Sequence, residues 1–201
     1  MARPRLHDEA LRRRLLAVTS TAISERGVSG VTVRDVAARA GTSASAVYSL
    51  FGGRDALVHA VGDEAFARFA ARLDAAPRGG DPGADLLALG LAYREHALAE
   101  PEFYRVMFST AGAGAQDPER EAAVDSLTFG ALHDAVAALL AGSGRAGDAR
   151  EPALTLWALV HGLVELELHG LLPGTPDERA ARYTSALRAA GPALLGAAPT
   201  P

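Results

Sequence analysis

The feature that most constrains the fold is a pair of short helical segments joined at a glycine, over residues 32–51. Thr32 and Asp35 form a Thr-x-x-Asp pattern, typical of a helix start at which the hydroxyl and the carboxylate satisfy free backbone amides. Gly41 can supply the positive φ that a tight turn between helices often requires. Ser43 is placed to cap the second helix. The pattern predicts two helices that cross closely.

The second segment presents two different faces. Val47, Leu50 and Phe51 recur at helical spacing and predict a buried stripe. The predicted outward positions are small or polar, namely Thr42, Ala44, Ser45 and Tyr48. Such a helix face fits the major groove of DNA. A hairpin of core helices is the alternative, but basic flanks and an exposed polar helix do not serve a core.

Charge is divided unevenly along the chain. Residues 1–54 carry nine arginines and four acidic residues, whereas the remainder carries 11 arginines and 20 acidic residues, and the chain as a whole has a net charge of −4. A basic head on an acidic body indicates that only the head meets a polyanion. A solvated basic helix explains the charge equally well when charge is considered alone.

Turn residues divide the sequence into helical blocks, and almost no stretch alternates as a strand would. Glycine or proline breaks occur near residues 27–30, 41, 52–53, 77–83, 101, 112–118, 142–152 and 173–176. The sequence therefore predicts an all-α fold of about nine helices.

Several functions are excluded by what the sequence lacks. It contains no cysteine, so disulfides, thiolate metal sites and cysteine nucleophiles are excluded. It has no Gly-rich phosphate loop and no nucleophile elbow, so we expect no cofactor and no enzyme activity. No apolar run is long enough to cross a membrane and no signal-peptide core is present, so we expect a cytoplasmic protein without a membrane partner.

Residues 32–57 read TVRDVAARAGTSASAVYSLFGGRDAL. They resemble the helix-turn-helix of the TetR family, T-x-x-x-I-A-x-x-A-G-V-S-x-G-x-L-Y-x-x-F-x-x-K-x-x-L. The sequence departs from this pattern at Ala44-Ser45, where the family usually has Lys-Gly, and at Arg54, where it usually has Lys. The resemblance implies a bacterial transcriptional repressor that binds a near-palindromic operator in double-stranded DNA as a homodimer and is released by a small apolar effector. An activator would share all these residues.

The resemblance also implies which residues contact DNA. It places Thr32, Arg34, Tyr48 and Arg54 on phosphates, and Thr42, Ser43, Ala44 and Ser45 near base edges, with Val33 as a further DNA-binding position. The recognition face has no Arg, Asn or Gln, so it lacks the bidentate contacts that discriminate guanine or adenine. We expect specificity to depend on hydroxyls, thymine-methyl contacts, bridging water and DNA shape.

The run Trp157-Ala158-Leu159-Val160-His161-Gly162 resembles the Trp-x-x-x-His-Gly segment of one TetR C-terminal subclass. With it, the resemblance implies a DNA-binding domain over residues 1–53 and a ligand-binding and dimerisation domain over residues 54–201. We predict a dimer interface at Leu159, Gly162, Leu163 and Leu166. Aromatic and flexible residues form the predicted ligand pocket, with plain core packing as the alternative for most of them; they are Tyr93, Phe103, Met107, Phe108, Phe129, Trp157 and His161.

His161, Glu165 and His169 lie at i, i+4 and i+8 and form the one metal-like pattern in the sequence. Three such ligands on a straight helix span two turns, too far to close on a single ion, so we predict no metal site. A helical enzyme or carrier for an apolar compound, with a vestigial head, is the alternative from another class. Turnover of a ligand would favour that alternative.

Overall fold

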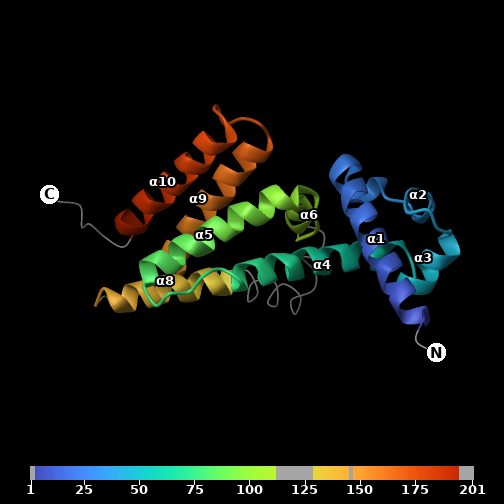
Figure 1. The fold of residues 1–201 in the computed structure, drawn as a ribbon, viewed down its shortest axis with the longest axis horizontal. Helices are drawn as coiled ribbons and strands as arrows, with labels where there is room; N and C mark the ends of the chain where they lie inside the picture. The colour runs from blue at the N-terminus through green and yellow to red at the C-terminus, as the bar shows by residue number, and fades with distance from the viewer. Residues whose placement is uncertain (1–2, 112–128, 145–146, 195–201) are drawn as a thin grey trace. The chain divides into compact units, whose positions relative to one another are not determined.

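The computed structural model describes residues 3–111, 129–144 and 147–194, and these residues form nine α-helices and one 3-10 turn, with no strand (Figure 1). The all-α prediction is therefore confirmed for the described part of the chain. The helices and the turns between them group into two compact units.

The first unit comprises Met1–Arg68 and Glu100–Glu121. It contains six helical elements, most of which contribute large apolar side chains to one core. The elements are α1 (Arg3–Arg26), η1 (Val28–Gly30), α2 (Val33–Arg39), α3 (Ala44–Phe51), the beginning of α4 (Arg54–Asp74) and α6 (Pro101–Ala111). Fully buried side chains from five of them form the core, namely Leu15, Leu16, Val36, Val47, Leu57, Val61, Tyr104 and Met107.

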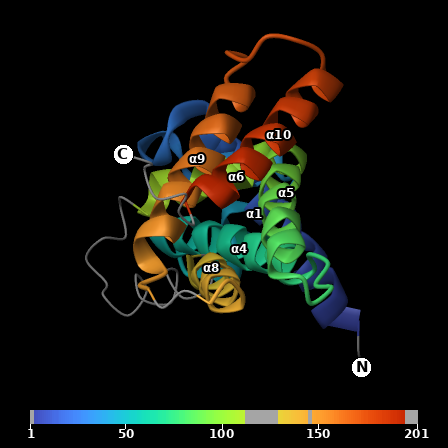
Figure 2. The ribbon, with the colours of Figure 1, turned by 90° about the vertical axis from the view of Figure 1, so that its left-hand side faces the viewer.

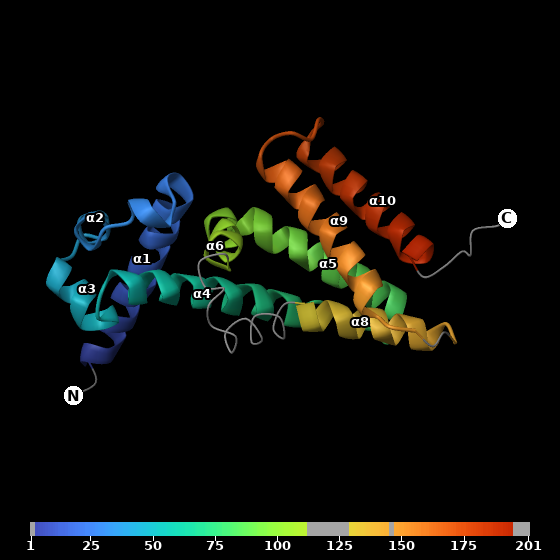
Figure 3. The same cartoon turned by 180° about the vertical axis from the view of Figure 1, so that it is seen from behind.

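The second unit comprises Phe69–Ala99 and Ala122–Pro201. Besides the end of α4, it contains α5 (Pro82–Ala99), α8 (Gly130–Gly142), α9 (Arg150–Leu168) and α10 (Pro176–Leu194). Helices α9 and α10 run side by side as a hairpin (Figures 2 and 3). One of its apolar clusters joins Val136 and Leu140 of α8 to Ala153 and Leu156 of α9.

Ion pairs and hydrogen bonds hold the hairpin on α5. Arg94 donates from Nε and Nη2 to the two carboxylate oxygens of Glu167, each over 2.7 Å. Arg179 of α10 donates from Nε to the same carboxylate over 3.2 Å. The Tyr183 hydroxyl donates to the carbonyl of Gly90 over 2.8 Å, and burial raises the pKa of this phenol. The buried carboxylate of Glu167 thus connects α5, α9 and α10.

The local signals at the first helix pair are largely confirmed. The Thr32 hydroxyl accepts from the N–H of Asp35, and the Ser43 hydroxyl accepts from the N–H of Ala46, each over 3.2 Å. Gly41 has a φ of 65°, as the tight turn requires. One expectation is wrong: the Asp35 carboxylate does not cap a backbone amide but pairs with Arg26 and Arg39, because cations lie within its reach and form stronger, charge-assisted bonds.

None of the described helices combines the length and the apolar character needed to cross a membrane.

Candidate functional site

The predicted recognition surface is the outward face of α3. Val47 is fully buried and fixes this helix on the core, while Tyr48 is 56% exposed and Ser45 and Ser49 are exposed beside it. Thr42 precedes the helix, and its N–H donates to the carbonyl of Ala37 over 2.9 Å, which closes the turn between α2 and α3. The exposed face therefore carries hydroxyls and small side chains, as the sequence predicted.

The two capping hydroxyls can still donate a hydrogen bond. Thr32 and Ser43 each use an oxygen lone pair to accept from a backbone N–H. A serine or threonine hydroxyl also has a proton to donate, so each side chain can cap its helix and donate to a DNA acceptor at the same time. Both residues are exposed.

An ion-pair network anchors α2 against the end of α1. Arg39 donates from Nη1 to Glu25 over 2.9 Å and its Nε lies 3.3 Å from Asp35, which also pairs with Arg26. The hydrogen bond from Arg26 holds the pKa of the Asp35 carboxyl below its usual value. These side chains are thereby engaged inside the head. Arg34, on the same short helix, is exposed and forms no ion pair with the described residues, so its charge is available.

Two predicted DNA contacts are placed differently from the expectation. Val33 is only 8% exposed and belongs to the core, so its side chain cannot reach DNA. Arg54 donates from Nε to the carbonyl of Val31 over 2.9 Å and from Nη2 to the carbonyl of Val28 over 2.5 Å. Its Nη1 donates to the carboxylate of Asp55 over 2.6 Å. The guanidinium therefore ties the start of α4 to the segment that precedes α2.

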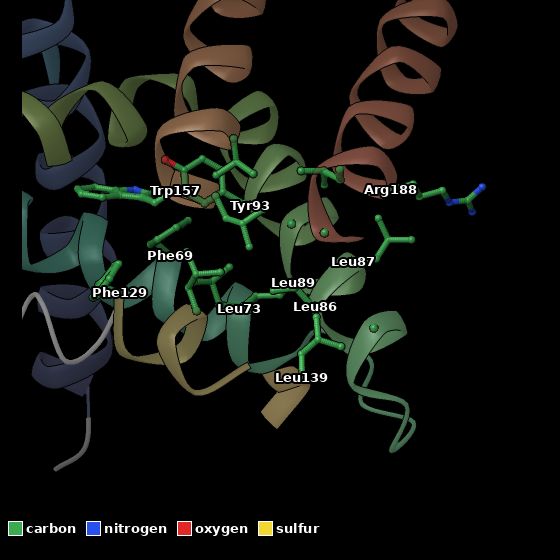
Figure 4. A pocket seen from close by; sticks show the side chains of 17 residues that line it. Phe69, Leu73, Leu86, Leu87, Leu89, Tyr93, Phe129, Leu139, Trp157 and Arg188 are labelled. Atoms are coloured by element: carbon green, nitrogen blue, oxygen red, sulfur yellow. The ribbon is translucent and has the colours of Figure 1, made fainter. Parts of the chain in front are cut away.

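The second unit contains an apolar cavity of about 300 Å³. Side chains from α4, α5, α8, α9 and α10 surround it (Figure 4). Sequence reasoning found three of its residues, Tyr93, Phe129 and Trp157. It missed the leucines and the small residues that form most of the wall, among them Leu73, Leu86, Leu89, Leu132, Leu187, Gly90 and Gly191.

Four predicted pocket residues do not line this cavity. Phe103, Met107 and Phe108 belong to α6 in the first unit, where Phe103 and Met107 are buried in the core. Their spacing in the sequence indicated an apolar helix face, but it could not show whether this face packs in the first or the second unit. His161 lies just behind the wall, with its Nδ1 3.3 Å from the Tyr93 hydroxyl oxygen.

A second hollow of about 820 Å³ in the same unit is different in character. Its lining includes Asp74, Asp85, Asp134 and Arg78. Asp85 is already engaged by the backbone amides of Gly79 and Gly80, so part of this polar lining serves the turn before α5. It contains none of the residues that the sequence predicted for a ligand, and the apolar cavity is the better candidate.

The metal-like pattern on α9 does not form a site. His169 bonds to the carbonyl of Glu165 through Nδ1 over 2.8 Å, and His161 bonds to Tyr93. Within the described residues, no group of three or more His, Asp or Glu side chains could hold a metal ion.

The predicted interface residues lie on or beside the unburied side of α9. This helix buries Ala153, Leu156, Val160 and Val164 along one stripe. Leu166 is exposed, and Leu159, Gly162 and Leu163 are half-buried. A Cβ added at Gly162 would meet no atom within 4 Å. The outward side of α10 repeats small residues at i, i+4 and i+8, at Ala181, Ser185 and Ala189.

Comparisons with known proteins match two regions of the chain. Residues 15–61 match the model of bacterial regulatory proteins of the tetR family, and residues 86–190 match a tetracyclin repressor-like C-terminal domain. A transcriptional regulator from Rhodococcus sp. Rha1 is similar at 27% identity and a TM-score of 0.69, over 92% of this chain and 95% of that chain.

More distant structures share the fold. A TetR family transcription regulator from Marinobacter aquaeolei VT8 is 22% identical with a TM-score of 0.77, over 92% of this chain and 97% of that one. The TetR family regulator PfmR from Thermus thermophilus is 18% identical with a TM-score of 0.70, over 90% of this chain and 97% of that one. None of the curated proteins matches the sequence.

A helix-turn-helix head together with a helical C-terminal part defines a DNA-binding transcriptional regulator rather than an enzyme. The chain belongs to the TetR family.

Proposed function

We propose that this regulator is a ligand-responsive repressor that binds a near-palindromic operator as a homodimer and is released by a small apolar effector. The observation that carries the proposal is the exposed, polar face of α3, with Tyr48 and Ser45 standing out beside a buried Val47. A helix that exposes such a face at the end of a basic head is suited to a major groove.

The proposed DNA contacts follow from exposure and charge. Arg34, Thr32 and Tyr48 bind phosphates, which fixes the register of the head on the duplex. Thr42, Ser43, Ala44 and Ser45 face base edges. The functional domains that we propose are residues 1–53 for DNA binding and residues 54–201 for ligand binding and dimerisation.

The homodimer is proposed to form through α9 and α10. Gly162 and the small side chains of Ala181, Ser185 and Ala189 would allow a close approach at these positions, and Leu159, Leu163 and Leu166 add apolar area. A two-fold dimer would present two copies of α3 to major grooves about 34–36 Å apart, which accounts for a near-palindromic operator.

The effector is proposed to bind the apolar cavity of the second unit. To release DNA, it must bind the DNA-incompetent state more tightly than the DNA-bound state, and couplings of this kind are typically about 1–3 kcal/mol. A ligand that binds both states equally would switch nothing.

The test is binding of the full chain to the DNA that flanks its own gene, at two salt concentrations. The variant Arg34→Ala/Tyr48→Ala removes a charge and an aromatic hydroxyl from the exposed face. The matched control Arg150→Ala removes a charge from the exposed start of α9. We expect specific binding that weakens with salt, weakens further in the double variant and is unchanged in the control.

Equal, weak and sequence-indifferent binding by the wild type and the double variant, repeated against a genome-wide pool of fragments, would refute the operator assignment. Transcription that rises with the protein present, at an intact operator, would make the chain an activator instead of a repressor.

A further inference from the structure

The side chains around the apolar cavity contain few polar atoms. Of the seventeen lining residues, Tyr93 supplies the one side-chain oxygen, and Trp157 and Arg188 supply the side-chain nitrogens. No acidic side chain is among these seventeen described residues. The lining therefore has no group that could neutralise a cationic ligand.

The interior offers little to an anionic group, and to a cation it offers only the faces of aromatic rings such as Phe69 and Trp157. The Tyr93 hydroxyl lies 3.3 Å from His161 Nδ1, so its oxygen is already directed to a protein partner behind the wall. An anionic group placed among Phe69, Leu89 and Val160 would lose its hydration without a replacement. An anionic group of a ligand must consequently stay at the mouth, where water reaches it.

Arg188 is the ionised side chain at the edge of the cavity. Its stem contributes to the wall, while Figure 4 shows its guanidinium extended outward from the other labelled side chains. Arg188 is exposed and forms no ion pair with any described residue. Gly191, one turn further along α10, also lines the cavity, and a Cβ there would meet no atom within 4 Å. Open space and a free positive charge thus occur together on α10.

We infer that the effector belongs to the class of amphipathic anions: an apolar body that fills the cavity, and one terminal anionic group, such as a carboxylate, that stays at the mouth near Arg188. The inference rests on the proposed function, because it assigns the chemistry of the effector that this cavity binds. The same arrangement selects against apolar cations, since Arg188 repels them and no acidic side chain of the lining attracts them.

The test uses three probes that share one chain and differ in charge: decanoate, decanol and decyltrimethylammonium. Each is titrated into the full chain below its micelle concentration or, for decanol, below its solubility limit. Trp157 is the single tryptophan of the sequence and lines the cavity, so its fluorescence reports occupancy; calorimetry provides a second readout. We expect decanoate to bind more tightly than decyltrimethylammonium.

The variant Arg188→Gln isolates the charge. We expect it to weaken decanoate by roughly two- to fivefold, the range for an exposed ion pair, to leave decanol unchanged and to strengthen decyltrimethylammonium. The control Arg182→Gln removes an equal charge from another exposed position of α10 that does not line the cavity. It also removes a hydrogen bond from Arg182 to the carbonyl of Pro173, and it should preserve the order of the probes.

Failure of all three probes to bind would overturn the inference, as would tighter binding of the cation or equal losses in the two variants. None of these results affects operator binding, which is measured on DNA without a ligand. If the wild type binds no operator but still prefers decanoate, the proposed repressor function is refuted and the inferred ligand class is not.

Discussion

Removing the carboxylate of Glu167 should destabilise the second unit more than any nearby surface change. This side chain is 6% exposed and accepts three N–H groups, two from Arg94 and one from Arg179. Deleting one partner of a buried pair costs roughly 3–5 kcal/mol, because the remaining charge is left without compensation. Arg94 is 13% and Arg179 26% exposed, so both cations can recover some water. We therefore expect Glu167→Ala to cost about 2–3 kcal/mol.

The assay is urea unfolding at fixed protein concentration, followed by the fluorescence of Trp157, which lies on the same helix as Glu167. The control Glu165→Ala removes a carboxylate that is 31% exposed and lies 3.4 Å from His169, and should cost at most about 0.5 kcal/mol. Adding Arg94→Ala to Glu167→Ala should cost less than the sum of the single changes. Equal costs for Glu167→Ala and Glu165→Ala would refute this account of the network.

Two further predictions concern acid and assembly. The hydrogen bond from Arg94 lowers the pKa of Glu167 from its ordinary 4.5. The ionised carboxylate therefore contributes its full stability to the fold above pH 4.5, and this contribution is lost as the pH falls through the lowered pKa. The urea midpoints of the wild type and Glu167→Gln should converge on acidification. Gly162→Leu should preserve the helical content, because a Cβ at Gly162 meets no atom within 4 Å. It should weaken the proposed dimer at least tenfold in sedimentation equilibrium, and an unchanged dimer would place the interface elsewhere.

Features encoded by a few neighbouring residues could be predicted from the sequence. The caps at Thr32 and Ser43 and the turn at Gly41 each depend on residues within three positions, and all are confirmed. Asp35 was the exception: it pairs with Arg39 four positions away on its own helix and with Arg26 nine positions away on another helix, and a capping pattern carries no information about the second cation. Helix starts marked by proline could also be predicted from neighbouring residues, as at Pro101 and Pro176, which begin α6 and α10.

The wall of the apolar cavity was predicted only in part, because it is formed by residues that are far apart in the sequence. Tyr93, Phe129 and Trp157 were found by residue type, since aromatic side chains are common in apolar pockets. Phe103 and Met107 are also apolar, but they belong to the core of the first unit. The glycines at 90 and 191 were missed, because the effect of a missing Cβ depends on the neighbouring residues. At Gly90 it makes room for the side chain of Leu187, whereas at Gly191 it leaves open space.

Arg54 shows how the geometry changes the interpretation of a family position. The resemblance places it on a phosphate, whereas its guanidinium binds the carbonyls of Val28 and Val31. A residue that contacts phosphate contributes about 0.9 to the slope of log affinity against log salt, and a residue that only positions the head contributes little. We therefore expect Arg34→Ala to reduce the slope of log affinity against log salt by about one unit. Arg54→Ala should lower the affinity for DNA and the melting temperature of the head, and should leave this slope nearly unchanged. A full unit lost from the slope in Arg54→Ala would mean that DNA binding releases the guanidinium from the loop, and Arg54 would then be a phosphate contact as the resemblance implies.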